Sequence, residues 1–189
     1  MINHRRRAGG AASEWFTVVD YGEQTNADSD WRGYTVRLVI PASELLTSTG
    51  TSIRLTLLFY GVSKAIHYDE LWLGHAAASG DPYDFDGNQV QILSGGSGAF
   101  DVPASATESL LTDEVDFDFD GSKNLVLSAY FNGTDSNDDL SYTLSASSAS
   151  SYYKSSTNDA STTNAASYTS WSSSRNLMIR KLEAYGISP

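Results

Sequence analysis

The residues best suited to chemistry are carboxylates at alternate positions, Asp116, Asp118 and Asp120, followed by Gly121. Oxygen ligands at this spacing open the calcium loops of EF-hand proteins. Such a loop ends in a bidentate Glu at its twelfth position, which is Leu127 in this chain. We therefore interpret the run as solvent-facing acids of a strand, where charge also protects a sheet edge. A calcium site of another kind stays open, with these candidate ligands: Asp84, Asp86 and Asp120.

The histidines offer a second kind of chemistry. A Ser-His-Asp set can be written from His67, Asp69, His75, Ser79 and Asp81, but a chain rich in Ser and Asp produces such sets without selection for catalysis. The sequence contains no nucleophile elbow, zinc-protease motif, phosphate-binding glycine loop or dinucleotide fingerprint. It has no cysteine, which excludes disulfides, thiol catalysis and cysteine-bound metals. The sequence therefore predicts a protein that is not an enzyme, with no cofactor or metal assigned.

Aromatic residues are the third candidate for a functional site. Tyr152, Tyr153, Tyr168 and Trp171 punctuate a tract rich in Ser, Thr and Asn that runs from Ser145 to Ser174. Aromatic faces bind the C–H groups of sugars, with polar neighbours on the hydroxyls. The same residue types also anchor loops and fill subunit interfaces. We expect packing or an interface first, with glycan binding as the alternative, and we expect the spaced aromatics to order the tract.

The charge balance limits the partners. The chain has 12 Lys and Arg against 23 Asp and Glu, a formal net charge of -11, which disfavours nucleic acid. No apolar run is long enough for a membrane helix, and no signal peptide is visible at the start. Arg5, Arg6 and Arg7 form a basic cluster within residues 1–12. We predict a flexible N-terminal arm there, able to dock on an acidic partner, although such arms are more often simply solvated.

Alternating apolar and polar residues indicate β-strands that would position these groups. Tyr34 to Ile40 places Val36 and Leu38 on one face and Arg37 on the other. The clearest signal runs from Asp113 to Gly133, where two alternating segments flank Asp-Gly-Ser-Lys-Asn. Because glycine tolerates positive φ and Asp and Asn favour turns, we predict a β-hairpin here.

The whole chain has about nine to eleven such short segments and no long helical pattern. Asn176 to Tyr185 is the one segment with an open alternative, since its composition also suits a helix, but we predict a closing strand. This pattern is typical of an all-β fold. The sequence therefore predicts a single antiparallel β-sandwich, jelly-roll-like, over residues 13–189.

Three segments carry a resemblance to a known family: Leu71 to Phe85 (LWLGHAAASGDPYDF), Asp120 to Phe131 (DGSKNLVLSAYF) and Ser151 to Ser155 (SYYKS). Over about residues 50–185 the chain resembles a β-sandwich module of tailed-bacteriophage structural proteins. Related modules stand beside SGNH-type esterase domains. The chain itself lacks that family's Gly-Asp-Ser block, and its last histidine is His75, so an Asp-x-x-His near the end is also missing.

The resemblance implies a structural protein of the virion surface, either a capsid decoration protein or a tail appendage, made in the bacterial cytoplasm. Its partners would be other virion proteins, and it would assemble as a homo-oligomer. The alternative is a glycan-binding receptor-recognition module of a tail fibre or spike, with Trp171 and the Tyr152–Tyr153 pair as its platform. A domain associated with an esterase or glycosidase is a third possibility.

Overall fold

The computed structural model describes residues 12–22, 26–28, 31–46, 48–57, 65–103, 109–132, 140–143, 148–171, 176–177 and 179–187. Within these ranges the chain forms sixteen β-strands and one short 3-10 turn, Ala42–Glu44, but no α-helix. All pairings between these strands are antiparallel, so the predicted antiparallel β-sandwich is confirmed. The strands outnumber the prediction because several have only two or three residues, and the jelly-roll topology stays a prediction.

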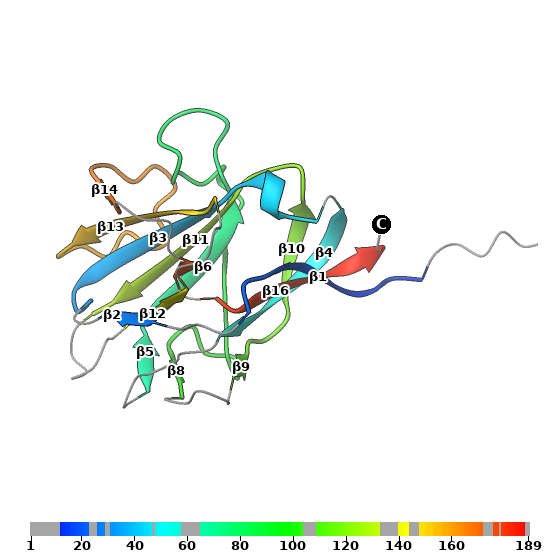
Figure 1. The fold of residues 1–189 in the computed structure, drawn as a ribbon, viewed down its shortest axis with the longest axis horizontal. Helices are drawn as coiled ribbons and strands as arrows, with labels where there is room; N and C mark the ends of the chain where they lie inside the picture. The colour runs from blue at the N-terminus through cyan, green and yellow to red at the C-terminus, as the bar shows by residue number, and fades with distance from the viewer. Residues whose placement is uncertain are drawn as a thin grey trace, which may run out of the picture.

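Two larger sheets form the sandwich, with the six-stranded sheet at the left and the five-stranded sheet at the right of Figure 1. In spatial order, the six-stranded sheet consists of β14 (Thr169–Ser170), β13 (Ser150–Ser155), β3 (Tyr34–Ile40), β11 (Leu125–Phe131), β6 (Glu70–His75) and β7 (Val90–Gln91). The five-stranded sheet consists of β1 (Glu14–Asp20), β16 (Lys181–Ile187), β4 (Thr49–Leu57) and β10 (Val115–Asp120), with β9 (Leu110–Leu111) also paired to β4.

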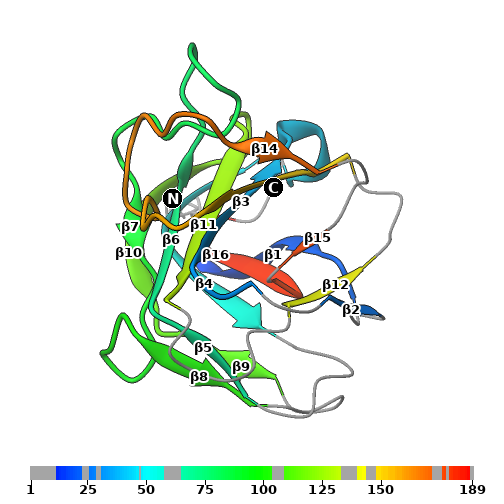
Figure 2. The same ribbon diagram turned by 90° about the vertical axis from the view of Figure 1, so that its left-hand side faces the viewer.

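Two small sheets accompany the larger ones. One contains β15 (Asn176–Leu177), β12 (Leu140–Thr143) and β2 (Asn26–Asp28), and the other pairs β5 (Ile66–Tyr68) with β8 (Phe100–Val102). Figure 2 shows β5 and β8 at the bottom of the molecule and the three-stranded sheet at the right. The segment predicted as a closing strand contains β15 and most of β16, and β16 lies between β1 and β4. No described helix is long and apolar enough to cross a membrane.

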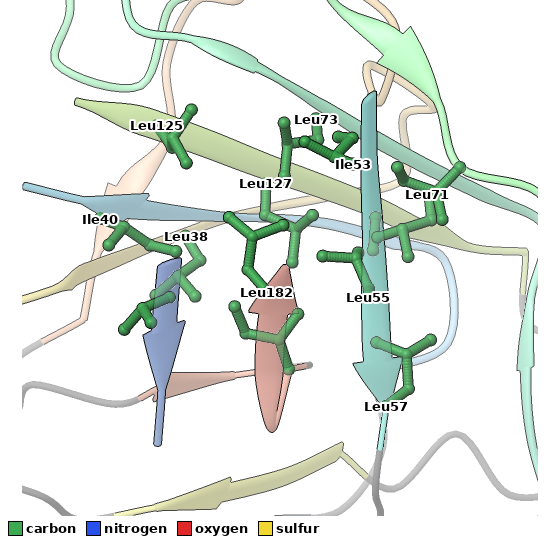
Figure 3. Packing of buried hydrophobic residues seen from close by; sticks show 14 of the residues in the cluster. Leu38, Ile40, Ile53, Leu55, Leu57, Leu71, Leu73, Leu125, Leu127 and Leu182 are labelled. Carbon is green, nitrogen blue, oxygen red and sulfur yellow. The ribbon is translucent and has the colours of Figure 1, made fainter. Parts of the chain in front are cut away.

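The main core lies between the two large sheets, where strand alternation turns one apolar row from each strand inward. Leu127 of β11 is paired with Leu38 of β3 on one side and Leu73 of β6 on the other. Figure 3 shows these rows meeting Ile53, Leu55 and Leu57 of β4 and Leu182 of β16, all with 0% exposure. The inward faces predicted for β3 and for the described part of β4 are therefore confirmed.

The predicted hairpin from Asp113 to Gly133 is wrong in its pairing. Strand β10 pairs with β4 in the five-stranded sheet, whereas β11 pairs with β3 and β6 in the six-stranded sheet. The tight turn exists, since the Lys123 amide donates to the Asp120 carbonyl at 3.1 Å. At this turn the chain crosses from one sheet to the other. The two strands therefore pack face to face across the core and are not paired edge to edge in one sheet.

The glycine of this turn serves a different purpose from the one predicted. Gly121 does not have positive φ. A β-carbon added at Gly121 would lie 2.2 Å from the Leu46 carbonyl oxygen and 3.0 Å from the Ser48 amide nitrogen. The residue is therefore required by the close approach of two backbone segments.

Candidate functional site

The outer face of the six-stranded sheet is covered by two loops of its own chain, residues 76–89 and 156–168. They form a second apolar cluster with the sheet, in which Tyr83 and Phe85 of the first loop join Val39 of β3 and Val126 of β11. The loops are joined to each other, since the Phe85 amide donates to the Thr163 carbonyl at 3.0 Å. Much of the Ser/Thr-rich tract thus forms a layer packed on the outer face of the sheet. Because of this layer, β3 and β11 are buried on both faces.

Arg37 is the centre of this layer, with 0% exposure on the outer side of β3. Its guanidinium donates to the backbone carbonyls of Tyr83 at 2.7 Å, Asp159 at 2.8 Å and Thr162 at 2.5 Å. Its central carbon lies 4.7 Å from the centroid of the Phe85 ring. Burial lowers the pKa of Arg37, but a guanidinium remains charged in proteins. The sequence pattern placed Arg37 on the second face of β3 and gave no sign that loops would bury it.

Asp84 is a buried carboxylate that holds the same two loops. One oxygen accepts a hydrogen bond from the Asp81 amide and the other from the Ala165 amide, both at 3.0 Å. Both oxygens are therefore already used within the protein. Of the other proposed calcium ligands, Asp86 accepts from the Asn88 amide and Asp120 from Ser122. Among the described residues, no group of three or more His, Cys, Asp or Glu side chains is arranged to hold a metal.

The predicted aromatic residues do not form one platform. Tyr152 and Tyr153 are consecutive in β13 and therefore point to opposite faces of the sheet. On the outer side, the Tyr152 and Tyr168 rings each lie 4.9 Å from the Tyr83 ring. Burial raises the pKa of Tyr168 to about 12.

The remaining two aromatics pack on the inner side of β13. The Tyr153 ring lies 5.5 Å from Trp171 and 5.7 Å from Trp31, which is itself buried. Trp31 and Trp171 are closer still, with ring centroids 4.5 Å apart. The Trp171–Tyr152–Tyr153 platform expected for a glycan is thus divided between two packed clusters.

His67 and His75 lie in different parts of the fold. His67 belongs to β5, and its Nδ1 is 2.8 Å from a carboxylate oxygen of Asp101, a partner that the sequence analysis missed. Only the cross-strand pairing of β5 with β8 brings the two together, so no local pattern could reveal it. Asp81, an acid of the Ser-His-Asp set that the sequence analysis set aside, accepts a hydrogen bond from the Tyr83 hydroxyl at 2.9 Å.

His75 ends β6 and is buried, with 3% exposure. Its Nε2 accepts a hydrogen bond from the Asp120 amide at 3.1 Å, so the proton of the neutral ring is on Nδ1. Burial lowers the pKa of His75, opposed by Asp86 and Asp120 and assisted by Lys123. The ring also packs 4.8 Å from Phe117, which fixes it between the two sheets.

We predict that protonation of His75 destabilises the fold. Its folded pKa lies below the unfolded value of 6.5, so the unfolded chain binds a proton first as the pH falls. The contribution of His75 to the free energy of unfolding should be constant above about pH 6.5, the unfolded pKa. It should fall as the pH drops from there to the folded pKa. Urea denaturation between about pH 7.5 and pH 5 should show this decline, and His75→Gln should flatten it. His67→Gln is the control; an unchanged slope in His75→Gln would contradict the assignment.

The outer side of the five-stranded sheet presents a different surface, which we call the open face. It comprises Trp15 of β1, Arg54 of β4, and Glu183 and Tyr185 of β16. The Trp15 and Tyr185 rings are 5.6 Å apart, and the Arg54 guanidinium lies 4.2 Å from the Trp15 centroid. Tyr185 is 36% exposed, and Ile187, two residues further along the strand, is 55% exposed.

Positive charge gathers beside the open face. A hollow of about 390 Å³ is lined by three cations, Arg54, Arg180 and Lys181, against two acids, Asp20 and Glu183, together with the half-exposed Leu111. Glu183 lies among these cations. Burial opposes its ionisation, but hydrogen bonds from Arg54 and Lys181 have the larger combined effect, so its pKa is lowered. The surface thus combines exposed aromatic and aliphatic groups with cations on a chain that is acidic overall.

The basic cluster Arg5, Arg6 and Arg7 lies outside the described residues, at the end of the chain that leads into β1. Comparison with models of known protein families and with curated proteins gave no match.

Proposed function

We propose that this chain is a non-enzymatic structural protein of a bacteriophage particle, and that it binds an acidic surface of another virion protein through the open face. The open face carries the proposal. Trp15 and Tyr185 are a pair of aromatic side chains, with the Arg54 guanidinium over the Trp15 ring, and Trp, Tyr and Arg are the residues enriched among those that dominate binding energy in protein interfaces. The resemblance of the sequence to virion structural modules supports the same role.

Charge supports the choice of partner. Arg54, Arg180 and Lys181 lie beside the open face, and Arg5 to Arg7 precede β1, which is an edge strand of that sheet. An acidic partner would meet cations from both sources, which favours association and correct orientation. The rest of this acidic chain would be repelled from such a partner, which disfavours other docked orientations.

The test is sedimentation of the purified protein with emptied phage capsids. Deletion of residues 1–12 should abolish binding, and Tyr185→Ser should weaken it by at least about tenfold, as expected for an interface aromatic. Leu46→Ser is the matched control, because Leu46 is 37% exposed and lies outside the open face. Full capsid occupancy by both the deletion and Tyr185→Ser would refute a role for this surface.

A further inference from the structure

The two large sheets differ in what covers their outer sides. The six-stranded sheet is covered by loops of its own chain, whereas exposed apolar groups remain on the outer side of the five-stranded sheet. Alternate residues of β16 project from that side: Lys181, Glu183, Tyr185 and Ile187. Leu111 of β9 shares it, because Leu111 and Lys181 are both paired with Thr56 of β4. This side therefore presents Tyr185, Ile187 and Leu111, exposed apolar groups of the kind that mark a protein interface.

Charges on this outer side are divided between the two ends of the strands. At one end, the cations Arg54, Arg180 and Lys181 outnumber the acids Asp20 and Glu183 that line the same hollow. We call these three cations the basic end. Towards the other end, β10 places three carboxylates on the outer side, because the residues between them are buried in the core. We call these carboxylates the acidic row: Asp116, Asp118 and Asp120.

The strand register gives the separation between these charges. Lys181 is paired with Thr56 of β4, whereas Asp120 is paired with Thr49 at the other end of the same strand. The two levels are therefore about 20 Å apart along the strands, at roughly 3.3 Å per residue. Tyr185 is paired with Ser52, which places the aromatic pair of Trp15 and Tyr185 between the two levels. An aromatic centre thus lies between charges of opposite sign.

We propose that two copies of this chain pair through the outer sides of their five-stranded sheets, about a two-fold axis that crosses the strands. Such an axis reverses the strand direction, so the basic end of each copy meets the acidic row of the other, and the contact occurs twice. The aromatic pairs lie near the axis, which gives the usual arrangement of an aromatic centre and a charged rim. A hollow of about 560 Å³ beside the acidic row, lined by Asp118, Asp120 and Ile187 among others, leaves space for the long side chains of the basic end.

The occupant is a second copy because the surface is complementary to itself. Its two ends carry opposite charges at the same distance from the aromatic pair, so one rotation satisfies both ends at once. The same pairing covers Tyr185, Ile187 and Leu111 together. No other surface of the chain is needed to complete the interface.

This pairing also regulates access to the open face, and in this respect the inference rests on the proposed function. The acidic row of the second copy occupies the basic end until the acidic surface of the virion protein replaces it. The pair must therefore separate before the chain docks on the capsid. The formation of the pair itself does not depend on the capsid, so the two ideas can fail separately.

The experiment is sedimentation equilibrium of the purified full-length chain in the analytical ultracentrifuge. At low salt the wild type should form a dimer with a dissociation constant below about 100 μM. The dimer should weaken at about 1 M NaCl, where charges are screened beyond about 3 Å. Two double variants, Asp116→Lys with Asp118→Lys and Arg180→Glu with Lys181→Glu, should each dimerise at least about tenfold more weakly, because both symmetric contacts become repulsive.

An equimolar mixture of the two double variants is the decisive sample. In the mixed pair, the new lysines of one copy meet the new glutamates of the other, and the unchanged charges meet in the second contact. The mixture should therefore dimerise like the wild type, although neither component does so alone. Asp81→Lys is the control for a change of net charge, since Asp81 is exposed on the loop that covers the other sheet, and it should dimerise normally. Urea denaturation checks that each variant is folded.

A wild type that stays monomeric at low salt, or a mixture no more dimeric than its components, would overturn the pairing and leave capsid docking untouched. The variant Asp116→Lys with Asp118→Lys keeps Trp15, Tyr185 and the basic end, so as a monomer it should sediment with emptied capsids at least as well as the wild type. Failure of this variant alone would overturn the role of the second copy as a cover. Failure of the wild type to bind capsids would instead overturn the proposed function, whatever its dimerisation.

Discussion

Replacing Arg37 by methionine is expected to lower the free energy of unfolding by about 3–5 kcal/mol, the range seen when one partner of a buried charged network is removed. The substitution keeps the length of the side chain but deletes the donors to three backbone carbonyls, those of Tyr83, Asp159 and Thr162. The Tyr83 carbonyl, whose bond is buried, is left without this donor at a cost of about 1–3 kcal/mol, and the part-buried carbonyls of Asp159 and Thr162 lose theirs as well. Urea denaturation, followed by tryptophan fluorescence, measures the loss.

Arg54→Met is the matched control. Arg54 also contacts an aromatic ring and a carboxylate, but its side chain is 27% exposed, and the largely buried Glu183 keeps a second cation, Lys181, at 3.1 Å. We expect it to cost about 1 kcal/mol or less, as for exposed ion pairs. An Arg37→Met variant as stable as Arg54→Met would mean that water or side-chain rearrangement satisfies the three carbonyls, and that Arg37 does not hold the two loops.

The importance of Arg37 shows where sequence reasoning reached its limit. The alternation of Tyr34 to Ile40 correctly assigned the inward row, because a strand has only two faces and one of them must be apolar. The two-residue alternation of apolar side chains does not determine whether the second face of the strand contacts water or another layer of the protein. That depends on residues 76–89 and 156–168, which join β3 only through long-range contacts such as Arg37 to Asp159.

The same limit explains the error over β10 and β11. The sequence identified both strands and the turn between them, because these features are local. Partner choice is not local. Strand β11 is buried on both faces, with Leu125 to Ala129 all inaccessible, which suits a central strand between β3 and β6. Strand β10 keeps Asp116 and Asp118 exposed and therefore belongs to the sheet whose outer side meets water.

Prediction of the functional site had the same limit, because residue types can be identified from the sequence but their long-range grouping cannot. The residue types were identified, but their grouping was not: the aromatic tract separates into two clusters because neighbours in a strand face opposite ways. A hollow between β10 and the His75 end of β6 was likewise not anticipated, although Asp86, Asp116, Asp118 and His75 were each considered, because only the folded chain brings its lining residues together.

The crossing between the sheets leads to the second large effect. Gly121→Ala should lower the free energy of unfolding by about 2–3 kcal/mol, near the upper range for overpacking. The new methyl group would lie 2.2 Å from the Leu46 carbonyl oxygen, and neither backbone segment can move freely. The Gly121 amide donates to the Ser48 carbonyl at 2.9 Å, so relieving the clash also strains that hydrogen bond. The shift of the urea denaturation midpoint measures the cost.

Gly98→Ala separates this effect from a general cost of adding a methyl group. There the new β-carbon would also lie 2.2 Å from its nearest neighbour, but that neighbour is Nε2 of Gln91, at the end of a flexible side chain. A change of rotamer relieves this overlap, so we expect a loss below about 1 kcal/mol. If the two variants lose the same free energy of unfolding, the close backbone contact is not the reason why position 121 requires glycine. If only Gly121→Ala is destabilised, the crossing between the layers depends on the contact of this turn with Leu46 and Ser48.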